Sequence, residues 1–246
     1  MSIENQTPRL LNRESAPSRA LTIDDVFMTA IPGTPREQTV WQDIGQLLQR
    51  SLEILIAAVA LVVTSPIMLP VALIIRLDSP GPVIFRQRRV GLKGRIFTFY
   101  KFRTLYADAK ERFPELYAYA YTPTEVVNLK FKREEDPRIT RAGRWLRKST
   151  LDELPNFWNL LKGDIAIVGP RPEIPEMLKH YTPEQVVKFA VRPGITGLAQ
   201  THGRGNLAFQ QTIAWDLEYV KHKSLWLDIK IIVRTVRMLA TLDGAY

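Results

Sequence analysis

The segment LEILIAAVALVVTSPIMLPVALII, from Leu52 to Ile75, is the one long apolar run in the chain, and it decides the fold. Its 24 residues contain a single charge, Glu53, and are enough to cross the hydrocarbon core of a bilayer as a helix. A buried core helix of a soluble protein is the alternative, but such helices are rarely this long in a chain of this size. The run therefore predicts a membrane helix.

Two prolines in the second half of the run, Pro66 and Pro70, distinguish between membrane geometries. A proline inside a helix removes a backbone N–H and collides with the carbonyl four residues earlier, so a strong bend is predicted. The hydroxyls of Thr64 and Ser65 are placed to satisfy carbonyls that lose a partner. Basic residues flank both ends and do not favour a crossing: Arg50, Arg76, Arg86, Arg88 and Arg89. These features favour a re-entrant helix-break-helix hairpin, broken at Ser65-Pro66, and a single crossing stays open.

The remaining sequence divides into a polar arm and a compact domain. Residues 1–38 are polar and lack an apolar signal segment, which predicts a poorly ordered arm. Residues 39–77 are the amphipathic lead-in and the membrane helix. The sequence of residues 78–246 indicates an α+β domain that is mainly helical, with a strand pair around residues 91–95. Amphipathic and surface helices are predicted at 106–119, 138–147, 153–162, 173–180, 183–189, 207–222 and 226–241.

Charge and composition limit the classes of partner and of chemistry. The chain has 34 Lys and Arg against 25 Asp and Glu, a formal charge of +9, which favours nucleic acid, anionic lipid or phosphorylated small molecules as partners. No interleaved aromatic RNA-binding motif accompanies the basic residues, so nucleic acid is disfavoured. The absence of cysteine excludes disulfides and cysteine nucleophiles. The three histidines are too scattered for a metal cluster, and no HExxH or GxSxG motif occurs.

Adjacent acids, Asp152 and Glu153, lie in the densest polar region, RKSTLDELPNFWNLLKGDIAIVGPRPE (147–173). A capping box from Thr150 to Glu153 would explain them, although Pro155 fits better if Asp152 is itself the helix cap. Helix N-termini also attract phosphate. An aspartate held there among cations stays ionised and can attack phosphorus or hold a divalent cation; the cations are Arg144, Arg147, Lys148, Lys162 and Arg171. From these residues alone, capping and catalysis both stay open.

Two further segments are suited to anions. GPRP (169–172) presents Arg171 between two prolines, and the planar guanidinium matches phosphate oxygens; a plain turn is the alternative. RPGITGLAQTHGRG (192–205) has four glycines and two arginines, Arg192 and Arg204, which suits a backbone cradle for an anion. It lacks the Walker spacing, so it does not indicate an ATPase.

Several motifs together resemble the bacterial sugar transferase family, the monotopic polyprenyl-phosphate phosphoglycosyl transferases, in their small form. They are KFRT (101–104), DPRITRAGRWLRKSTLDELPNFWNLLKGDIAIVGPRPE (136–173), PGITGLAQ (193–200), GR (203–204) and WDLEYVKHKSLWLDIKIIVRTV (215–236). The resemblance runs from about residue 47 to the C-terminus. It implies transfer of a sugar 1-phosphate from a UDP-sugar to undecaprenyl phosphate, with release of UMP, at the cytoplasmic face of the bacterial inner membrane. The resemblance also implies Mg²⁺ as the cofactor and membrane lipid as a partner, and it allows a homo-oligomer. The reaction would be the first membrane step of exopolysaccharide, capsule, O-antigen or glycoconjugate synthesis.

The resemblance also implies roles for individual residues. Asp152 matches a nucleophile that forms a covalent phosphosugar intermediate in a ping-pong reaction, and Glu153 matches its partner. Both are candidate Mg²⁺ ligands. Asp216 is a candidate metal or network residue, and a helix-surface acid is the alternative for it. Candidates for phosphate or fold-network contacts are Lys101, Arg103, Arg147, Arg171 and Arg204. The segment THGRGN (201–206) departs from the motif that is common in the family, so the identity of the donor sugar stays open. An inactive membrane-anchored scaffold is the alternative function, and the intact acid pair disfavours it.

Overall fold

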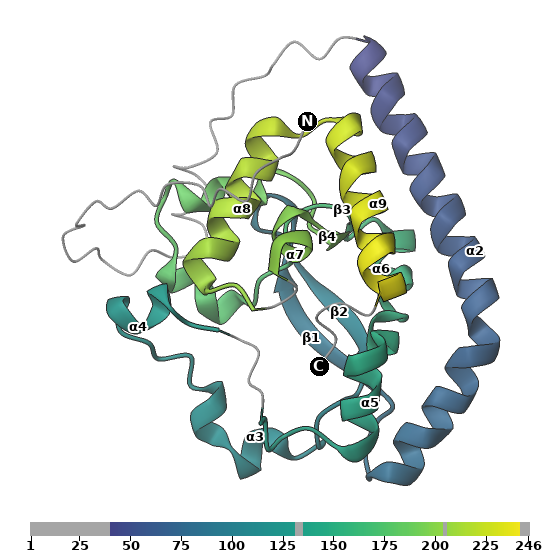
Figure 1. Ribbon diagram of the computed structural model, residues 1–246, viewed down its shortest axis with the longest axis vertical. Helices are drawn as coiled ribbons and strands as arrows, with labels where there is room; N and C mark the ends of the chain where they lie inside the picture. Colours follow the sequence, from purple (N-terminus) through teal and green to yellow (C-terminus); the bar gives the residue numbers. More distant parts are fainter. Residues whose placement is uncertain (1–39, 131–134, 204–205, 242–246) are drawn as a thin grey trace.

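The long apolar run forms one helix, α2, from Val40 to Asp78, which is continuous through Pro66 and Pro70. The computed structural model describes residues 40–130, 135–203 and 206–241, so the predicted arm lies outside the described residues. Figure 1 shows α2 bowed along one side of the domain. The break predicted at Ser65-Pro66 is corrected to a curve within a single helix, because the helix does not end at this position.

A serine hydroxyl satisfies the backbone where Pro66 interrupts it. Pro66 has no N–H to donate to the carbonyl of Val62, and the Oγ of Ser65 donates to that oxygen instead at 2.8 Å. The Oγ1 of Thr64 donates to the carbonyl of Ala60 at 2.7 Å. The predicted role of Ser65 is confirmed, and it explains how α2 continues past Pro66 without leaving the carbonyl of Val62 unpaired in an apolar setting. The carbonyl of Ala60 is not one that a proline frees, so the bond from Thr64 does not fill the predicted role.

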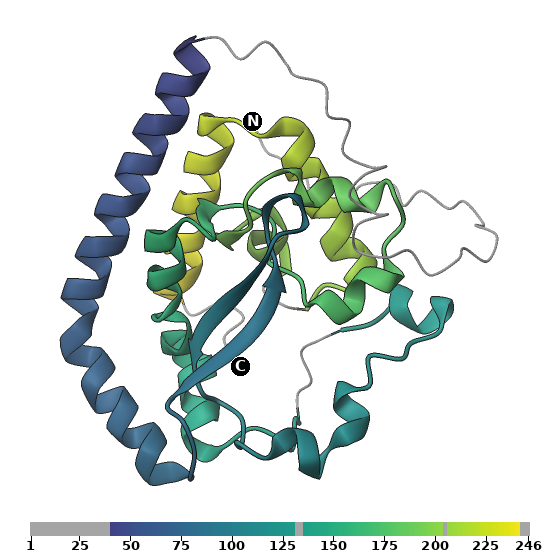
Figure 2. The ribbon, with the colours of Figure 1, turned by 180° about the vertical axis from the view of Figure 1, so that it is seen from behind.

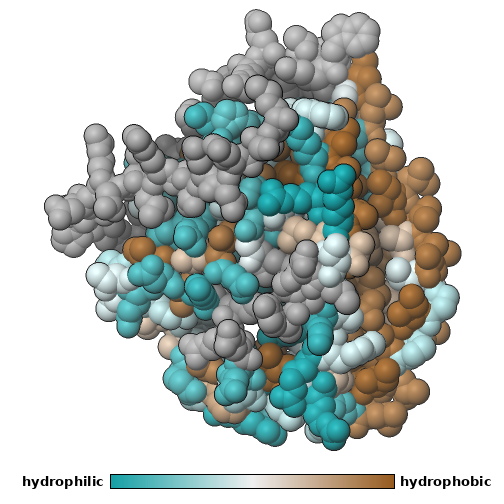
Figure 3. Space-filling model, viewed as in Figure 1, coloured by the Kyte–Doolittle hydropathy of each residue, from teal (hydrophilic) through white to brown (hydrophobic). Residues whose placement is uncertain are grey.

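One side of α2 is apolar and exposed. It is the one helix among the described residues that is long and apolar enough to cross a membrane, by length and composition. Figure 3 shows apolar side chains along this edge of the molecule; the most exposed on α2 are Leu77, Leu69 and Val62. The opposite side packs on the domain, where Ala57 joins Phe97, Phe99, Leu160 and Ile165, and Val71 and Ile75 join Phe102 and Leu146.

The predicted strand pair is confirmed as an antiparallel hairpin, with β1 (Ile84–Val90) paired to β2 (Ile96–Phe102). Its register places Arg89 opposite Phe97 and Gln87 opposite Phe99. Since side chains alternate across a strand, Lys101 shares a face with Phe97 and Phe99, and its Nζ lies 5.4 Å from the centre of the Phe99 ring. The hairpin therefore delivers Arg89 and Lys101 to the same side of the sheet.

A second, unpredicted sheet pairs β3 (Ala166–Val168) with β4 (Gly194–Thr196) in parallel. The two backbones approach so closely that a Cβ on Gly194 would lie 2.1 Å from the nitrogen of Gly169. Hydrogen bonds continue past the strands, from the Gly169 N–H to the Thr196 oxygen and from the Gly194 N–H to the Pro170 oxygen, each 2.9 Å long. This contact holds the GPRP turn beside the glycine-rich segment.

The rest of the domain is helical, as predicted, in short elements. The predicted helix at 106–119 is divided, and two predicted helices are 3₁₀ segments (η4 and η5). In order, the elements are η1 Leu92–Gly94, α3 Ala109–Arg112, η2 Pro114–Tyr117, α4 Pro123–Val127, α5 Arg141–Ser149, η3 Leu151–Glu153, α6 Asn156–Lys162, η4 Pro175–His180, η5 Gln185–Ala190, α7 Leu198–Gly203, α8 Phe209–His222 and α9 Leu225–Thr241. Figure 2 shows α5 and α6 between α2 and the hairpin.

Candidate active site

The acid pair lies in a tight turn between two helices. After α5, Thr150 adopts a left-handed conformation with φ of 62°, and the 3₁₀ turn η3 carries Asp152 and Glu153. Helix α6 begins only at Asn156, after Pro155. The prediction that Asp152 caps this helix is therefore wrong, because the cap position is occupied by Pro155. The turn leaves both carboxylates available for contacts with the neighbouring strand.

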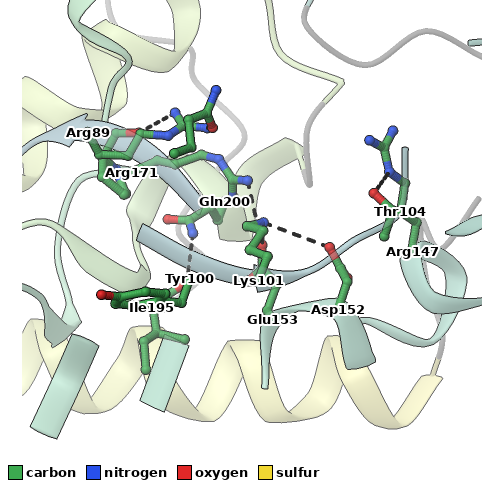
Figure 4. A network of polar contacts seen from close by, with 12 residues as sticks. Arg89, Tyr100, Lys101, Thr104, Arg147, Asp152, Glu153, Arg171, Ile195 and Gln200 are labelled. Atoms are coloured by element: carbon green, nitrogen blue, oxygen red, sulfur yellow. Dashed lines mark hydrogen bonds and ion pairs between the residues drawn. The ribbon is translucent and has the colours of Figure 1, made fainter. Parts of the chain in front are cut away.

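Lys101 joins the turn to the hairpin. Its Nζ forms an ion pair with Oε1 of Glu153 and lies 3.9 Å from Oδ2 of Asp152. Nη2 of Arg171, from the GPRP turn, lies 3.6 Å from the same Glu153 oxygen. Figure 4 shows Lys101 and Glu153 together, with Arg171 on one side of them and Asp152 on the other. The structure thus brings together four of the residues that the sequence predicts for the site.

The two carboxylates have different electrostatic environments. Burial raises the pKa of Glu153, but the charges of Lys101 and Arg171 outweigh it and hold the pKa at about 2. Burial raises the pKa of Asp152 above its ordinary value, and Lys101 opposes that shift only in part. Burial also lowers the pKa of Lys101, although Glu153 acts against it. The environment therefore separates the pKa values of the two acids, a pattern that is typical of catalytic carboxylate pairs.

Arg147 approaches the acid pair from another direction. It comes from the last turn of α5, and its Nε donates to Oγ1 of Thr104 at 3.1 Å. Burial lowers its pKa, while the charges of Asp136 and Asp152 raise it. In Figure 4, Arg147 and Arg171 lie to either side of Asp152. A phosphate group beside Asp152 would therefore meet positive charge on both sides.

Arg103 does not belong to this group. Its side chain is buried, its Nε donates to the carbonyl of Pro82 at 2.6 Å, and its Nη1 and Nη2 donate to Oγ and the carbonyl of Ser79 at 2.7 and 2.8 Å. Of the two contacts predicted for Arg103, phosphate or fold network, the structure shows the fold contact, because the guanidinium is engaged by backbone oxygens where α2 ends.

Replacing Arg103 with methionine is expected to lower the free energy of unfolding by roughly 2–4 kcal/mol, because buried carbonyls lose their donors. Chemical unfolding in detergent would measure it. Arg112→Met is the matched control, because Arg112 makes an exposed ion pair with Asp108 that contributes little. Unchanged stability together with weaker donor binding would restore the phosphate role to Arg103.

The other predicted residues lie apart from the acid pair or outside the described residues. Asp216 is fully buried in α8, and its Oδ2 lies 2.9 Å from Nζ of Lys188. Burial raises the pKa of Asp216, and Lys188 opposes the shift. Of the two roles predicted for Asp216, metal ligand or network residue, the structure shows the network role, since Asp216 is half of a buried ion pair. Arg204 falls in residues 204–205, which are outside the described residues.

The carboxylates of Asp152 and Glu153 suit a Mg²⁺ ion that is also bound by substrate phosphates. Within 40–130, 135–203 and 206–241 there is no group of three His, Asp or Glu side chains suited to a metal. Asp152 and Glu153 offer two adjacent carboxylates, and Mg²⁺ is commonly held by one or two carboxylates together with substrate phosphates and water. The residues present therefore suit an ion shared with a diphosphate and not an all-protein cage.

Two residues that the sequence reasoning missed support the Arg171 turn. Nη1 of Arg89 donates to the carbonyl of Pro172 at 2.8 Å, and burial lowers the pKa of Arg89 to about 10. Glu173 accepts a hydrogen bond of 2.8 Å from the hydroxyl of Tyr181. The alternation of side chains along the strand segment RQRRV could have identified Arg89 as an inward-facing residue. Arg86 and Arg88 point to the exposed face of the strand, and Arg89 points to the other face.

Comparisons with known proteins agree with these motifs. The profile of the family described as "Bacterial sugar transferase" matches residues 44–241. Galactosyl transferase CpsE of Streptococcus agalactiae is 40% identical over 200 residues, 81% of this chain and 43% of that protein. UDP-glucose:undecaprenyl-phosphate glucose-1-phosphate transferase of Caulobacter vibrioides is 39% identical over 228 residues, 89% of this chain and 78% of that protein. Exopolysaccharide production protein ExoY of Rhizobium meliloti is 34% identical over 212 residues, 86% and 94% of the two chains.

The matched region contains every part of the site described above. The chain spans less than half the length of CpsE, whereas it spans most of the Caulobacter and Rhizobium proteins. The profile match runs from the first turns of α2 to the end of α9, and so includes the acid pair, Lys101 and the GPRP turn. The chain belongs to the bacterial sugar transferase family.

Proposed function

We propose that this protein transfers a sugar 1-phosphate from a UDP-sugar to undecaprenyl phosphate and releases UMP. The observation that carries the proposal is the acid pair, in which Asp152 has a raised pKa and Glu153 a lowered one beside Lys101 and Arg171. Relatives named as undecaprenyl-phosphate sugar phosphate transferases support the substrate class. The step would contribute to exopolysaccharide, capsule or related glycan synthesis.

The proposed reaction has two displacements at one phosphorus. A carboxylate oxygen of Asp152 attacks the phosphorus that bears the sugar, the bond from this phosphorus to the oxygen shared with the second phosphate breaks, and UMP leaves with that oxygen. An oxygen of undecaprenyl phosphate then attacks the same phosphorus, and the bond to Asp152 breaks to regenerate the carboxylate. A covalent intermediate divides one difficult displacement between anions into two easier ones.

The surrounding cations make this approach of anions feasible. Lys101 and Arg171 balance the charge of Glu153 and of the phosphates, and Arg147 adds charge on the other side of Asp152. A carboxylate with a raised pKa is a more basic, stronger nucleophile once ionised. Mg²⁺, held by Asp152 and Glu153, would supply further neutralisation of the diphosphate. Chelation with EDTA is therefore expected to stop UMP release, and excess Mg²⁺ to restore it.

The test of the proposal is a donor screen. Purified protein with Mg²⁺ and undecaprenyl phosphate would be given UDP-glucose, UDP-galactose and their N-acetyl and diamino relatives, with UMP release as the readout. One donor is expected to give turnover, and mass spectrometry without acceptor is expected to find its phosphosugar on Asp152. If no donor releases UMP or labels the protein, the inactive scaffold is favoured instead.

We also propose that α2 re-enters the cytoplasmic face of the inner membrane and does not cross it. Both ends of its apolar run are tied to one domain: Nη1 of Arg192 lies 2.7 Å from Oε2 of Glu53, and Ile75 packs with Phe102 and Leu146. A helix that crossed the bilayer would place these two ends on opposite sides. A helix curved near Pro66 can instead immerse its exposed apolar side in one leaflet.

Cysteine labelling would test this topology, since the chain has no cysteine of its own. Gln46→Cys and Pro80→Cys place single thiols at exposed positions before and after the apolar run. In sealed inside-out vesicles, both are expected to react with an impermeant maleimide, and in right-side-out vesicles neither. Labelling of the two positions from opposite sides would contradict re-entry.

A further inference from the structure

We propose that α2 positions the acid pair, through arginine and aspartate contacts to the outer ends of the two helices that flank it. This inference rests on the proposed function, because it assigns positioning residues to that reaction. The acid pair lies in η3, between the end of α5 and the start of α6. Figures 1 and 2 show α2 running beside both helices.

The first contact is at the far end of α6. Nη1 of Arg50 donates to the carbonyl of Leu160 and Nη2 to the carbonyl of Leu161, each at 2.7 Å. Carbonyls in the last turn of a helix lack the regular partner four residues on, and the carbonyl of Leu160 accepts from the N–H of Gly163 as well as from Arg50. A cation at this end also complements the helix dipole. A side chain of α2 therefore caps the helix that follows the acid pair.

Glu53 holds this arginine in place. It is 1% exposed, and its Oε2 lies 3.3 Å from Nη1 of Arg50. Arg192 donates to both oxygens of Glu53, at 2.7 and 3.1 Å. Arg192 lies two residues before β4, so the cluster links α2 to α6 and to the segment that pairs with the Arg171 turn. The only charge in the apolar run thus has a specific partner set within the described residues.

The second contact is at the beginning of α5. Oδ2 of Asp78, the last residue of α2, accepts a hydrogen bond of 3.1 Å from the N–H of Ala142. Together with the cap residue Thr140, it satisfies N–H groups in the first turn of α5 and places a negative charge at the positive end of the helix. The segment from α5 through η3 to α6 is therefore fixed at both ends by one helix, with the acid pair between the two attachment points.

A positioning role predicts a loss in the rate of chemistry with little change in donor affinity. Displacing a reacting group by about 1 Å can reduce a rate by up to about a hundredfold, so Arg50→Gln is expected to lower kcat for UMP release by at least about tenfold. The donor KM is expected to stay within about twofold, since no donor contact is removed. Arg50→Lys keeps the charge but not the planar fork and is expected to recover part of kcat.

Hydrogen exchange on the same full-length proteins gives a readout that does not depend on activity. Arg50→Gln is expected to increase amide exchange in residues 151–162, which contain the acid pair and α6, and Asp78→Asn in residues 141–153. Exchange in α8 should not change in either variant. Arg76→Gln is the matched control, because Arg76 is exposed on α2 and its one hydrogen bond to another described residue is to the nearby carbonyl of Gly81. It is expected to leave kcat and exchange unaltered.

The outcomes separate this inference from the proposed function. If Arg50→Gln loosens the end of α6 but keeps wild-type kcat, the contact is a structural cap only and the inference is overturned. If wild-type protein releases no UMP from any donor, the proposed function fails. In that case increased exchange at residues 151–153 in Arg50→Gln would still support the mechanical link to the acid pair, and unchanged exchange there would overturn it.

Discussion

Asp152→Asn is expected to reduce UMP release by at least about a thousandfold, because removing a nucleophile typically costs several orders of magnitude in kcat. The amide has almost the same shape as the carboxylate but no charge and little nucleophilicity. Asp152 is 8% exposed and lies 3.9 Å from Lys101, so the substitution should preserve packing. UMP release with donor and acceptor present measures the loss.

A second readout separates loss of the nucleophile from loss of the fold. Mass spectrometry of wild-type protein quenched with donor alone should find the phosphosugar adduct, and the asparagine variant should lack it while retaining wild-type thermal stability. Asp108→Asn is the matched control, since Asp108 is an exposed acid in a surface pair with Arg112. Undiminished turnover by Asp152→Asn would show that another group attacks phosphorus.

Lys101→Met is expected to produce the second largest effect, a loss of about a hundredfold in kcat/KM near neutral pH, because a cation aimed at developing negative charge is removed. The pH profile gives the more specific prediction. Burial raises the pKa of Asp152 and the charge of Lys101 lowers it; burial also raises the pKa of Glu153 and Lys101 again lowers it. Without Lys101 both pKa values rise.

The pH profile of activity in Lys101→Met is expected to shift in a definite direction, because the carboxylates of the acid pair are active in their ionised form. Activity falls on the acid side as the carboxylates become protonated, so a higher pKa moves this acid limb to higher pH. Lys101→Arg should return the limb toward its wild-type position, since it restores the charge. Lys110→Met, an exposed lysine on α3, should leave the profile unaltered. An acid limb that does not move in Lys101→Met would contradict the pairing.

Features with a local sequence signal were predictable. The apolar run gives α2 directly, and alternation on either side of residues 91–95 gives the hairpin, because the periods of helices and strands appear in the sequence itself. Ser65 was also predictable as a partner for the carbonyl that Pro66 frees, since the two positions are adjacent. The acid pair was recognisable from its motif, but its environment was not.

Features that depend on contacts between distant segments were not predictable. The pairing of β3 with β4 involves three residues on each strand and joins parts of the chain that are far apart in sequence. Arg103 was grouped with Lys101 because both lie in KFRT, yet β2 ends at Phe102 and Arg103 turns to the end of α2. Asp216 looks like a helix-surface acid until its partner Lys188, on η5, is known.

The two-sided character of α2 determines how a water-soluble form of this protein could be engineered. Removing the helix before residue 79 would uncover Phe102 and Leu146, and we expect such a fragment to aggregate. The row Val59, Val62, Val63, Leu69 and Leu73 is instead largely exposed. We expect polar substitutions along that row to keep the protein in solution without detergent while leaving the packed side of the helix intact, so redesign of one surface is preferable to truncation.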